Sequence, residues 1–277
     1  MTAIPGFPVE RLHLQRGDVR VEALPRGVMR LVLARPRVRN AFDAAMIADL
    51  SAVLDALAAL PVSELRLLLL EGEGEGFCAG GDLAYMKAQA AATAEQNLAD
   101  ARALGGMFRR LASFPVPVLC HVQGAAFGGG LGLAVCADYV LAEANAVFAT
   151  SEVRLGLVPG LIGPYVVRRL GLAQAAPLML TGRRVTAAEG LASGLVHRVL
   201  SPSAAAGQVL AELMEQFLAA GPEAARRTKA LLLEVSPLPD AGLSENTARA
   251  IAEARASAEG QQGMRAFFEK APPPWVP

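Results

Sequence analysis

Cysteine and histidine are scarce in this chain of 277 residues, which contains three of each. The cysteines, Cys78, Cys120 and Cys136, cannot all pair within the chain. None of them lies in a CxxC motif or in a histidine-containing metal spacing. We therefore expect reduced thiols, no metal site and a cytoplasmic location.

An excess of charge of either sign is also lacking, since Lys plus Arg and Asp plus Glu both number 26. No basic surplus favours nucleic acid as a partner, although one localised anion such as a phosphate is still compatible. Residues 1–10 have no apolar core of signal-peptide length. The most apolar stretch, 124–142, is interrupted by glycines and Asp138, so we expect no membrane span.

What is abundant is apolar sequence, 53% against 19% charged residues, which predicts a sizeable core. Strands joined by a turn are expected at 19–24 and 28–34. The apolar runs 65–71 and 117–122 are typical of strands buried on both faces. Helical spacing predicts helices between and after them, at 46–57 with Asp43 as N-cap, 82–112, 131–136, 163–180, 187–193, 204–219, 223–235 and 243–270. The pattern predicts an α/β core at residues 1–200 followed by a helical region at 201–277.

Two glycine-rich turns follow neighbouring buried strands and lead into helices. They are residues 72–82, reading GEGEGFCAGGD, and residues 124–130, reading GAAFGGG. Glycine lets backbone approach a ligand closely, and a helix N-terminus offers unsatisfied N–H groups. Two such turns on adjacent strands can direct two amides at one oxygen, as an oxyanion hole does.

Phosphate-binding alternatives fit these turns poorly. The second turn lacks the Lys-Ser/Thr of a Walker A motif, and neither turn reads GxGxxG. The remaining alternative is that the glycines only permit tight turns and close helix–strand packing. Taken one at a time, the turns leave these two readings evenly balanced.

Five segments in order resemble the crotonase (enoyl-CoA hydratase/isomerase) superfamily. Residues 77–83 (FCAGGDL) resemble its F-x-A-G-x-D-[LI] signature, and 124–138 its G-x-x-x-G-G-G-x-E-L-A-x-x-C-D turn. The others are the R-P-x-x-x-N-A stretch at 35–41, FATSE followed by GLVPG between 148 and 160, and the C-terminal GMRAFFEK at 263–270. The resemblance implies an α/β, crotonase-type spiral of ββα units with a C-terminal helical trimerisation region.

Carried over by position, the resemblance implies roles for individual residues. The oxyanion amides would be those of Gly81 and Gly129, and Glu152 would be the proton-transferring glutamate. The coenzyme A moiety of the substrate would meet Arg37, Val38, Arg39, Ala79, Gly80, Asp82, Leu83, Phe267 and Lys270. No cofactor beyond this coenzyme A is implied, and a homotrimer or homohexamer is expected.

One position departs from the family pattern, because Gly132 stands where hydratases of the family carry a second glutamate. Three explanations are open. Glu152 alone holds the water and moves its proton; another group or a carboxylate on the substrate holds the water; or Glu152 shuttles a proton between carbons, as in an enoyl-CoA isomerase. Polarisation of a thioester carbonyl supports all three chemistries because it acidifies the α-carbon and activates the β-carbon.

A finer likeness favours hydration. Residues 81–86, the turn with glycine at 132 and residues 151–156 resemble bacterial methylglutaconyl-CoA hydratases of leucine breakdown and their isohexenyl-glutaconyl relatives. Those substrates carry a distal carboxylate, for which Tyr85, Arg154 and Lys87 are candidate contacts. Aromatic packing explains Tyr85 better, and surface charge explains Arg154 and Lys87 better. A hydrogen-bonded core histidine explains His121 better than a second acid/base, and Cys78 has no histidine partner that would make it a nucleophile.

The sequence thus predicts reversible hydration or dehydration of an enoyl-CoA, branched or carboxylated, such as 3-methylglutaconyl-CoA. A double-bond isomerase using the same glutamate is the alternative. A non-catalytic acyl-CoA binder and an RNA-associated protein are two further possibilities, and the balanced charge gives the second little support.

Overall fold

The computed structural model describes residues 4–201 and 205–276. The larger of its two sheets is a mixed sheet of seven strands. Its strand order is β1-β2-β3-β4-β5-β7-β10, antiparallel as far as β3 and parallel from β3 onward. The strands are β1 (Arg11–Arg16), β2 (Val19–Leu24), β3 (Val28–Leu33), β4 (Leu67–Gly72), β5 (Val118–Val122), β7 (Tyr139–Ala142) and β10 (Arg198–Val199). The four strands predicted from apolar runs and alternation are confirmed to within two residues at each end, whereas β1 and β10 were not foreseen.

A second, smaller sheet carries the functional turns. It consists of β6 (Ala125–Phe127), β8 (Val147–Ala149) and β9 (Val185–Thr186), with β6 parallel to β8 and β9 antiparallel to it. These strands have two or three residues each, too short to show a period in the sequence. They were missed for that reason.

Both faces of the large sheet are buried, as the continuous apolar runs predicted. Leu68 and Leu70 of β4 belong to a core shared with α1 and α3, while Leu67 and Leu69 face a second core shared with α7. The helices are α1 (Ala44–Ala58), α2 (Leu83–Ala91), α3 (Ala94–Ala112), α4 (Gly129–Cys136), α5 (Gly163–Thr181), α6 (Ala187–Ser193), α7 (Ala206–Leu218), α8 (Pro222–Val235), α9 (Ala241–Ala256) and α10 (Ala258–Glu269). Asp43 caps α1 as predicted, accepting from the Met46 amide.

Two predicted helices are each divided in the structure. The stretch 82–112 breaks at Thr93, whose side chain forms a capping box with Gln96 and starts α3. The stretch 243–270 breaks at Ser257, which accepts from the Gly260 amide and starts α10. In both places a cap residue inside an apolar period begins a new helix, so the prediction of single helices was wrong.

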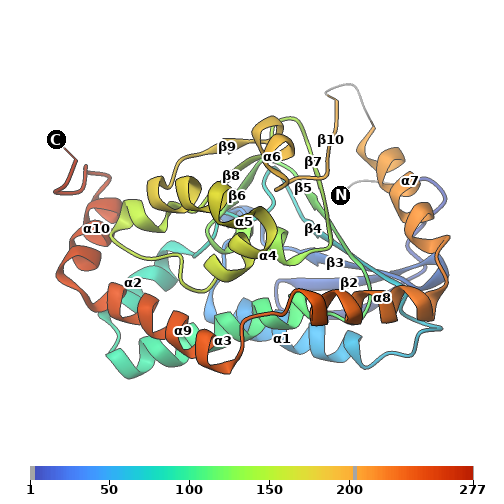
Figure 1. The fold of residues 1–277 in the computed structure, drawn as a ribbon, viewed down its shortest axis with the longest axis horizontal. Helices are drawn as coiled ribbons and strands as arrows, with labels where there is room; N and C mark the ends of the chain where they lie inside the picture. Colours follow the sequence, from blue (N-terminus) through green and yellow to red (C-terminus); the bar gives the residue numbers. More distant parts are fainter. Residues whose placement is uncertain (1–3, 202–204, 277) are drawn as a thin grey trace.

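Helices α8 and α9 run along the same side of the molecule as α1 and α3 (Figure 1), and α9 packs against α3. Lys229 of α8 is almost fully buried and donates to the Val116 carbonyl and to Asp138, 2.6 Å away. The predicted start of α7 at Ala204 lies outside the described residues. Within the described parts, no helix combines the length and apolarity needed to cross a bilayer.

His121 on β5 is a hydrogen-bonded core histidine. Its Nδ1 lies 2.8 Å from Glu71 Oε1, and the residue is 2% exposed. Burial alone lowers the pKa of His121, but the carboxylates of Glu143, 3.5 Å from Nε2, and of Glu71 raise it to about 9. It does not line the pocket described below, so the interpretation as a core residue fits its surroundings.

Candidate active site

The first glycine turn is held in place by a buried asparagine. Asn40, 0% exposed, donates from its amide nitrogen to the carbonyls of Glu73, Gly76 and Phe77, while its Oδ1 accepts from the Arg35 amide. The R-P-x-x-x-N-A stretch therefore shapes this turn. The family resemblance identified the motif but did not indicate that Asn40 holds the first glycine turn in place.

The two glycine turns pack backbone against backbone. Cys78 and Ala126 form a parallel bridge, with Cys78 donating to Ala125 and Phe127 donating to Cys78. A Cβ on Gly130 would lie 2.2 Å from the Cys78 carbonyl oxygen, and one on Gly80 would lie 2.9 Å from the Phe127 carbonyl oxygen. No side chain fits at either contact, so glycine is required there by close approach.

This bridge brings Gly81 and Gly129 to equivalent places, three residues beyond Cys78 and Ala126 respectively. Phe42 donates to the Gly80 carbonyl and accepts from the Asp82 amide, which turns the N–H of Gly81 away from Phe42. Gly129 is the first residue of α4, so its N–H has no partner within the helix. Both glycines line one pocket.

Glu152 reaches the same pocket from the smaller sheet. It lies in the 3-10 turn Ser151–Leu155, which follows β8, and its Oε1 is close enough to Gly128 that a Cβ there would lie 3.3 Å away. Its Oε2 is shielded from solvent and has no hydrogen-bond partner among the described residues. Burial raises the pKa of Glu152 to about 7, although a hydrogen bond from its own backbone opposes the rise.

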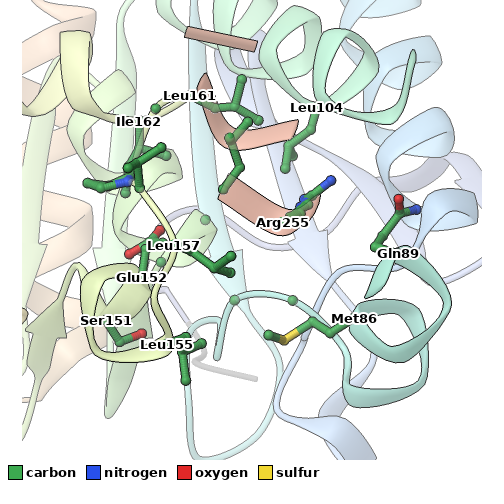
Figure 2. Close-up of a pocket in the computed structure, with 18 of the residues that line it drawn as sticks. Met86, Gln89, Leu104, Ser151, Glu152, Leu155, Leu157, Leu161, Ile162 and Arg255 are labelled. Atoms are coloured by element: carbon green, nitrogen blue, oxygen red, sulfur yellow. The ribbon is translucent and has the colours of Figure 1, made fainter. Parts of the chain in front are cut away.

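The pocket encloses about 340 Å³, and its wall is mainly apolar. Figure 2 shows Glu152 and Leu157 on one part of the wall and Met86, Gln89, Leu104 and Arg255 on another. A dry cavity with amide donors and one raised-pKa carboxyl is suited to proton transfer beside a polarised carbonyl.

The position that lacks the second glutamate is filled by neighbouring side chains. A Cβ on Gly132 would lie 2.5 Å from Cγ2 of Ile162 and 2.8 Å from Cε1 of Phe108. Both neighbours also line the pocket. A carboxylate at 132 would require them to move, so packing as well as chemistry distinguishes this site from a two-glutamate one.

The residues predicted to meet coenzyme A are only partly gathered at the pocket. Ala79, Gly80 and Phe267 line it, and the Ala79 amide donates to the Arg39 carbonyl, which brings residues 37–39 alongside. Six do not line it: Arg37, Arg39 and Leu83 are exposed, Val38 and Asp82 are half-buried, and Lys270 follows the last residue of α10 in a left-handed conformation.

Asp82 has a structural task in the chain itself. Its carboxylate caps α2 by accepting from the amides of Ala84 and Tyr85, and it pairs with Arg35 at 3.1 Å. These contacts occupy the group that was predicted to contact the substrate's coenzyme A.

Three other predicted polar contacts have local partners. The hydroxyl of Tyr85 donates to Asp100, although the ring lines the pocket. Lys87 lies over the Phe268 ring outside the pocket, and Arg154 is exposed and donates to the Thr181 carbonyl. Cys78 is buried, and burial raises the pKa of its thiol to about 12, which agrees with its exclusion as a nucleophile.

Arg255 and Gln89 are pocket residues that sequence reasoning missed. Ile251 and Arg255 are four residues apart on α9 and share one face, so a charged residue on an apolar helix face was the available signal. An arginine or a glutamine alone does not indicate a pocket residue, since most of them lie on the surface. Among the described residues, no group of three or more His, Cys, Asp or Glu is placed to hold a metal ion.

The chain is similar to known proteins over nearly its whole length. A model of the enoyl-CoA hydratase/isomerase family matches residues 24–276. The mouse (Mus musculus) enoyl-CoA hydratase domain-containing protein 2, mitochondrial, is 32% identical over 276 residues, covering 94% of this chain and 88% of that protein. An enoyl-CoA hydratase from Shewanella pealeana has a TM-score of 0.75 and 38% identity over 94% of this chain and 97% of its own. Pseudomonas aeruginosa AtuE has a TM-score of 0.76 and 40% identity over 94% of this chain and 100% of its own.

The chain therefore belongs to the enoyl-CoA hydratase/isomerase family, and the predicted α/β crotonase fold is confirmed, with two mixed sheets and C-terminal helices. Members of this family are hydro-lyases and isomerases that act on acyl-CoA thioesters, as a rule without a further cofactor. The predicted enzyme class is confirmed at that level.

Replacing Gly132 tests how tightly this position is packed. We expect Gly132→Ala to lower the free energy of unfolding by about 1–3 kcal/mol, because its methyl group would overlap Phe108 and Ile162. Gly105→Ala on α3 is the control: its Cβ would make an ordinary 3.4 Å contact with Leu161, and removing a helical glycine stabilises by roughly 0.5–1 kcal/mol. Urea unfolding measures both. Equal stability of the two variants would contradict the packing described here.

Proposed function

We propose that this enzyme catalyses the reversible hydration of an enoyl-CoA thioester, with the amides of Gly81 and Gly129 as oxyanion hole and Glu152 as the single proton-transferring group. The observation that carries the proposal is the Glu152 carboxyl. It lies beside the second glycine turn, with one oxygen buried and unpartnered and its pKa raised to about 7. An unsatisfied buried acceptor in a pocket is the kind of group that a substrate or its water completes.

In this mechanism the thioester oxygen accepts from both amides. Glu152 takes a proton from water as the water oxygen bonds to the β-carbon, and the π electrons move onto the carbonyl oxygen as an enolate. Collapse of the enolate draws the proton from Glu152 to the α-carbon, so the carboxylate is regenerated. Losing one donor of this kind costs about 3 kcal/mol in other oxyanion holes, which sets the scale of the stabilisation.

The alternative is double-bond isomerisation by the same glutamate. The absence of a side chain at Gly132 favours it, because a single carboxylate remains to orient the water. In that reaction Glu152 moves a proton between the α- and γ-carbons and no water is added. The products of the two reactions differ in mass from each other, since only hydration adds a water molecule to the substrate.

The finer proposal is that the acyl group is branched or carboxylated, as in 3-methylglutaconyl-CoA of leucine breakdown. The likeness to AtuE at 40% identity supports this without defining the substrate. We include in the proposal a division at residue 200 and a trimer or hexamer assembled through the helices that follow it. We further propose that the predicted coenzyme A contacts at 37–39, 79, 80, 83, 267 and 270 form as the ligand binds.

Glu152→Gln tests the assigned role. We expect turnover of an enoyl-CoA to fall by about 10²–10⁴-fold, because the amide cannot move a proton, while the dissociation constant of butyryl-CoA is nearly unchanged. Loss of the conjugated-thioester absorbance measures turnover, with a 3-enoyl-CoA and mass detection to separate hydration from isomerisation. Glu253→Gln, an exposed site on α9, is the control and should behave as the parent protein. Full activity in Glu152→Gln would end the proposal.

The pH dependence tests the environment of the same carboxyl. The working form of Glu152 in hydration is the carboxylate, and its raised pKa means that this form is lost as the pH falls through about 7. We expect kcat/KM for hydration to be level above that pH and to fall about tenfold per unit below it. If kcat/KM falls only as the pH approaches the ordinary pKa of a glutamate, then Glu152 is exposed to solvent and its pKa is not raised.

A further inference from the structure

An arginine that is largely buried, Arg255, lines the pocket that also contains Glu152, Gly81 and Gly129. Beyond Glu152 and the glycine amides, the wall is made by apolar side chains of α2, α3, α9 and the loop after Glu152, namely Met86, Leu104, Leu157, Leu161, Ile162 and Ile251. Arg255 of α9 lies among them with its side chain only 11% exposed. Arg154, the other lining arginine, is exposed and is held by the Thr181 carbonyl.

One nitrogen of the Arg255 guanidinium is held by acceptors outside the pocket. Nη1 donates to Asp100 Oδ2 at 2.9 Å and to Asn97 Oδ1 at 3.4 Å, and neither acceptor lines the pocket. Asp100 also accepts from the Tyr85 hydroxyl. Among the described residues, no partner takes the Nε and Nη2 donors of Arg255, so the planar edge of the guanidinium is available.

A second polar side chain that lines the same pocket has an unsatisfied atom. Gln89 of α2 lines the same pocket, and its Oε1 is buried with no hydrogen-bond partner among the described residues. Figure 2 draws Arg255 with Leu104 and Gln89 toward one side of the pocket and Glu152 toward the other. Turning the Gln89 amide about its last bond exchanges the positions of its NH₂ group and its oxygen, so that the buried position holds a donor.

Burying the polar groups of Arg255 and Gln89 would be unfavourable if the pocket bound a purely apolar acyl chain. Taking a guanidinium from water is unfavourable unless its donors find acceptors, and Nη1 alone is satisfied here. A carboxylate is the acceptor that matches the planar guanidinium edge, because two parallel N–H···O bonds can form. An apolar acyl tail would leave both Arg255 and Gln89 unsatisfied.

We propose that Arg255, assisted by Gln89, binds a carboxylate at the far end of the acyl chain and so selects enoyl thioesters of dicarboxylic acids. This rests on the proposed function, because the thioester end must lie at Gly81, Gly129 and Glu152 for the tail to reach α9. Asp100 and Tyr85 are positioning residues that hold the guanidinium toward the cavity.

Binding of a matched ligand pair tests the proposal without turnover. Glutaryl-CoA and butyryl-CoA share the thioester and differ at the far end by a carboxylate. By calorimetry we expect the parent protein to bind glutaryl-CoA on the order of 10- to 100-fold more tightly, as one charged hydrogen-bonded contact supplies. Arg255→Met should abolish that preference and leave the butyryl-CoA affinity unchanged. Arg249→Met, an exposed arginine on the same helix, should preserve it.

Three results would overturn the inference: no preference in the parent protein, a preference that survives Arg255→Met, or equal weakening of both ligands. The last would place Arg255 on the phosphates of coenzyme A. Because Arg255→Met leaves Asp100 without its cation, the double variant Asp100→Asn/Arg255→Met removes the pair together and should lose the same preference.

Turnover of glutaconyl-CoA and crotonyl-CoA then separates this inference from the proposed function. Hydration of crotonyl-CoA with no selectivity for the carboxylated substrate refutes the role of Arg255 alone. Absence of any enoyl-CoA turnover refutes the proposed function, whatever the calorimetry shows.

Discussion

The close contact between two glycine turns is the constraint on which the site depends. Gly80 lies against the Phe127 carbonyl and Gly130 against the Cys78 carbonyl, at separations that admit no side chain. This contact places the amides of Gly81 and Gly129 at one pocket. Asn40 supports the first turn from below, and the pairing of β6 with β8 carries the second turn together with Glu152. The geometry is therefore built from backbone, which side-chain substitution alters only indirectly.

Against that backbone frame, the side chains supply the differences between related sites. The space at Gly132 is taken by Phe108 and Ile162, so Glu152 has no second carboxylate beside it from this position. Burial gives Glu152 a pKa near neutrality, which suits a group that both accepts and returns a proton. The polar groups farther along the pocket, Arg255 and Gln89, then act on the acyl tail and not on the reacting carbons.

The sequence was informative where period and glycine spacing are strong. It predicted β2, β3, β4 and β5 of the large sheet, and the family resemblance singled out Gly81, Gly129 and Glu152, which do line one pocket. It failed where local capping overrides an apolar period, as at Thr93 and Ser257. It also could not find Arg255, because the value of that residue comes from α9 packing on α3, a contact between segments more than a hundred residues apart.

The most direct test of the central claim is a crystal structure of the Glu152→Gln variant with crotonyl-CoA bound. We expect the thioester oxygen at about 2.7–3.1 Å from both amide nitrogens, of Gly81 and of Gly129, with the side chain at 152 beside the α- and β-carbons. A thioester oxygen that accepts from neither amide, or an acyl chain bound elsewhere on the molecule, would contradict it.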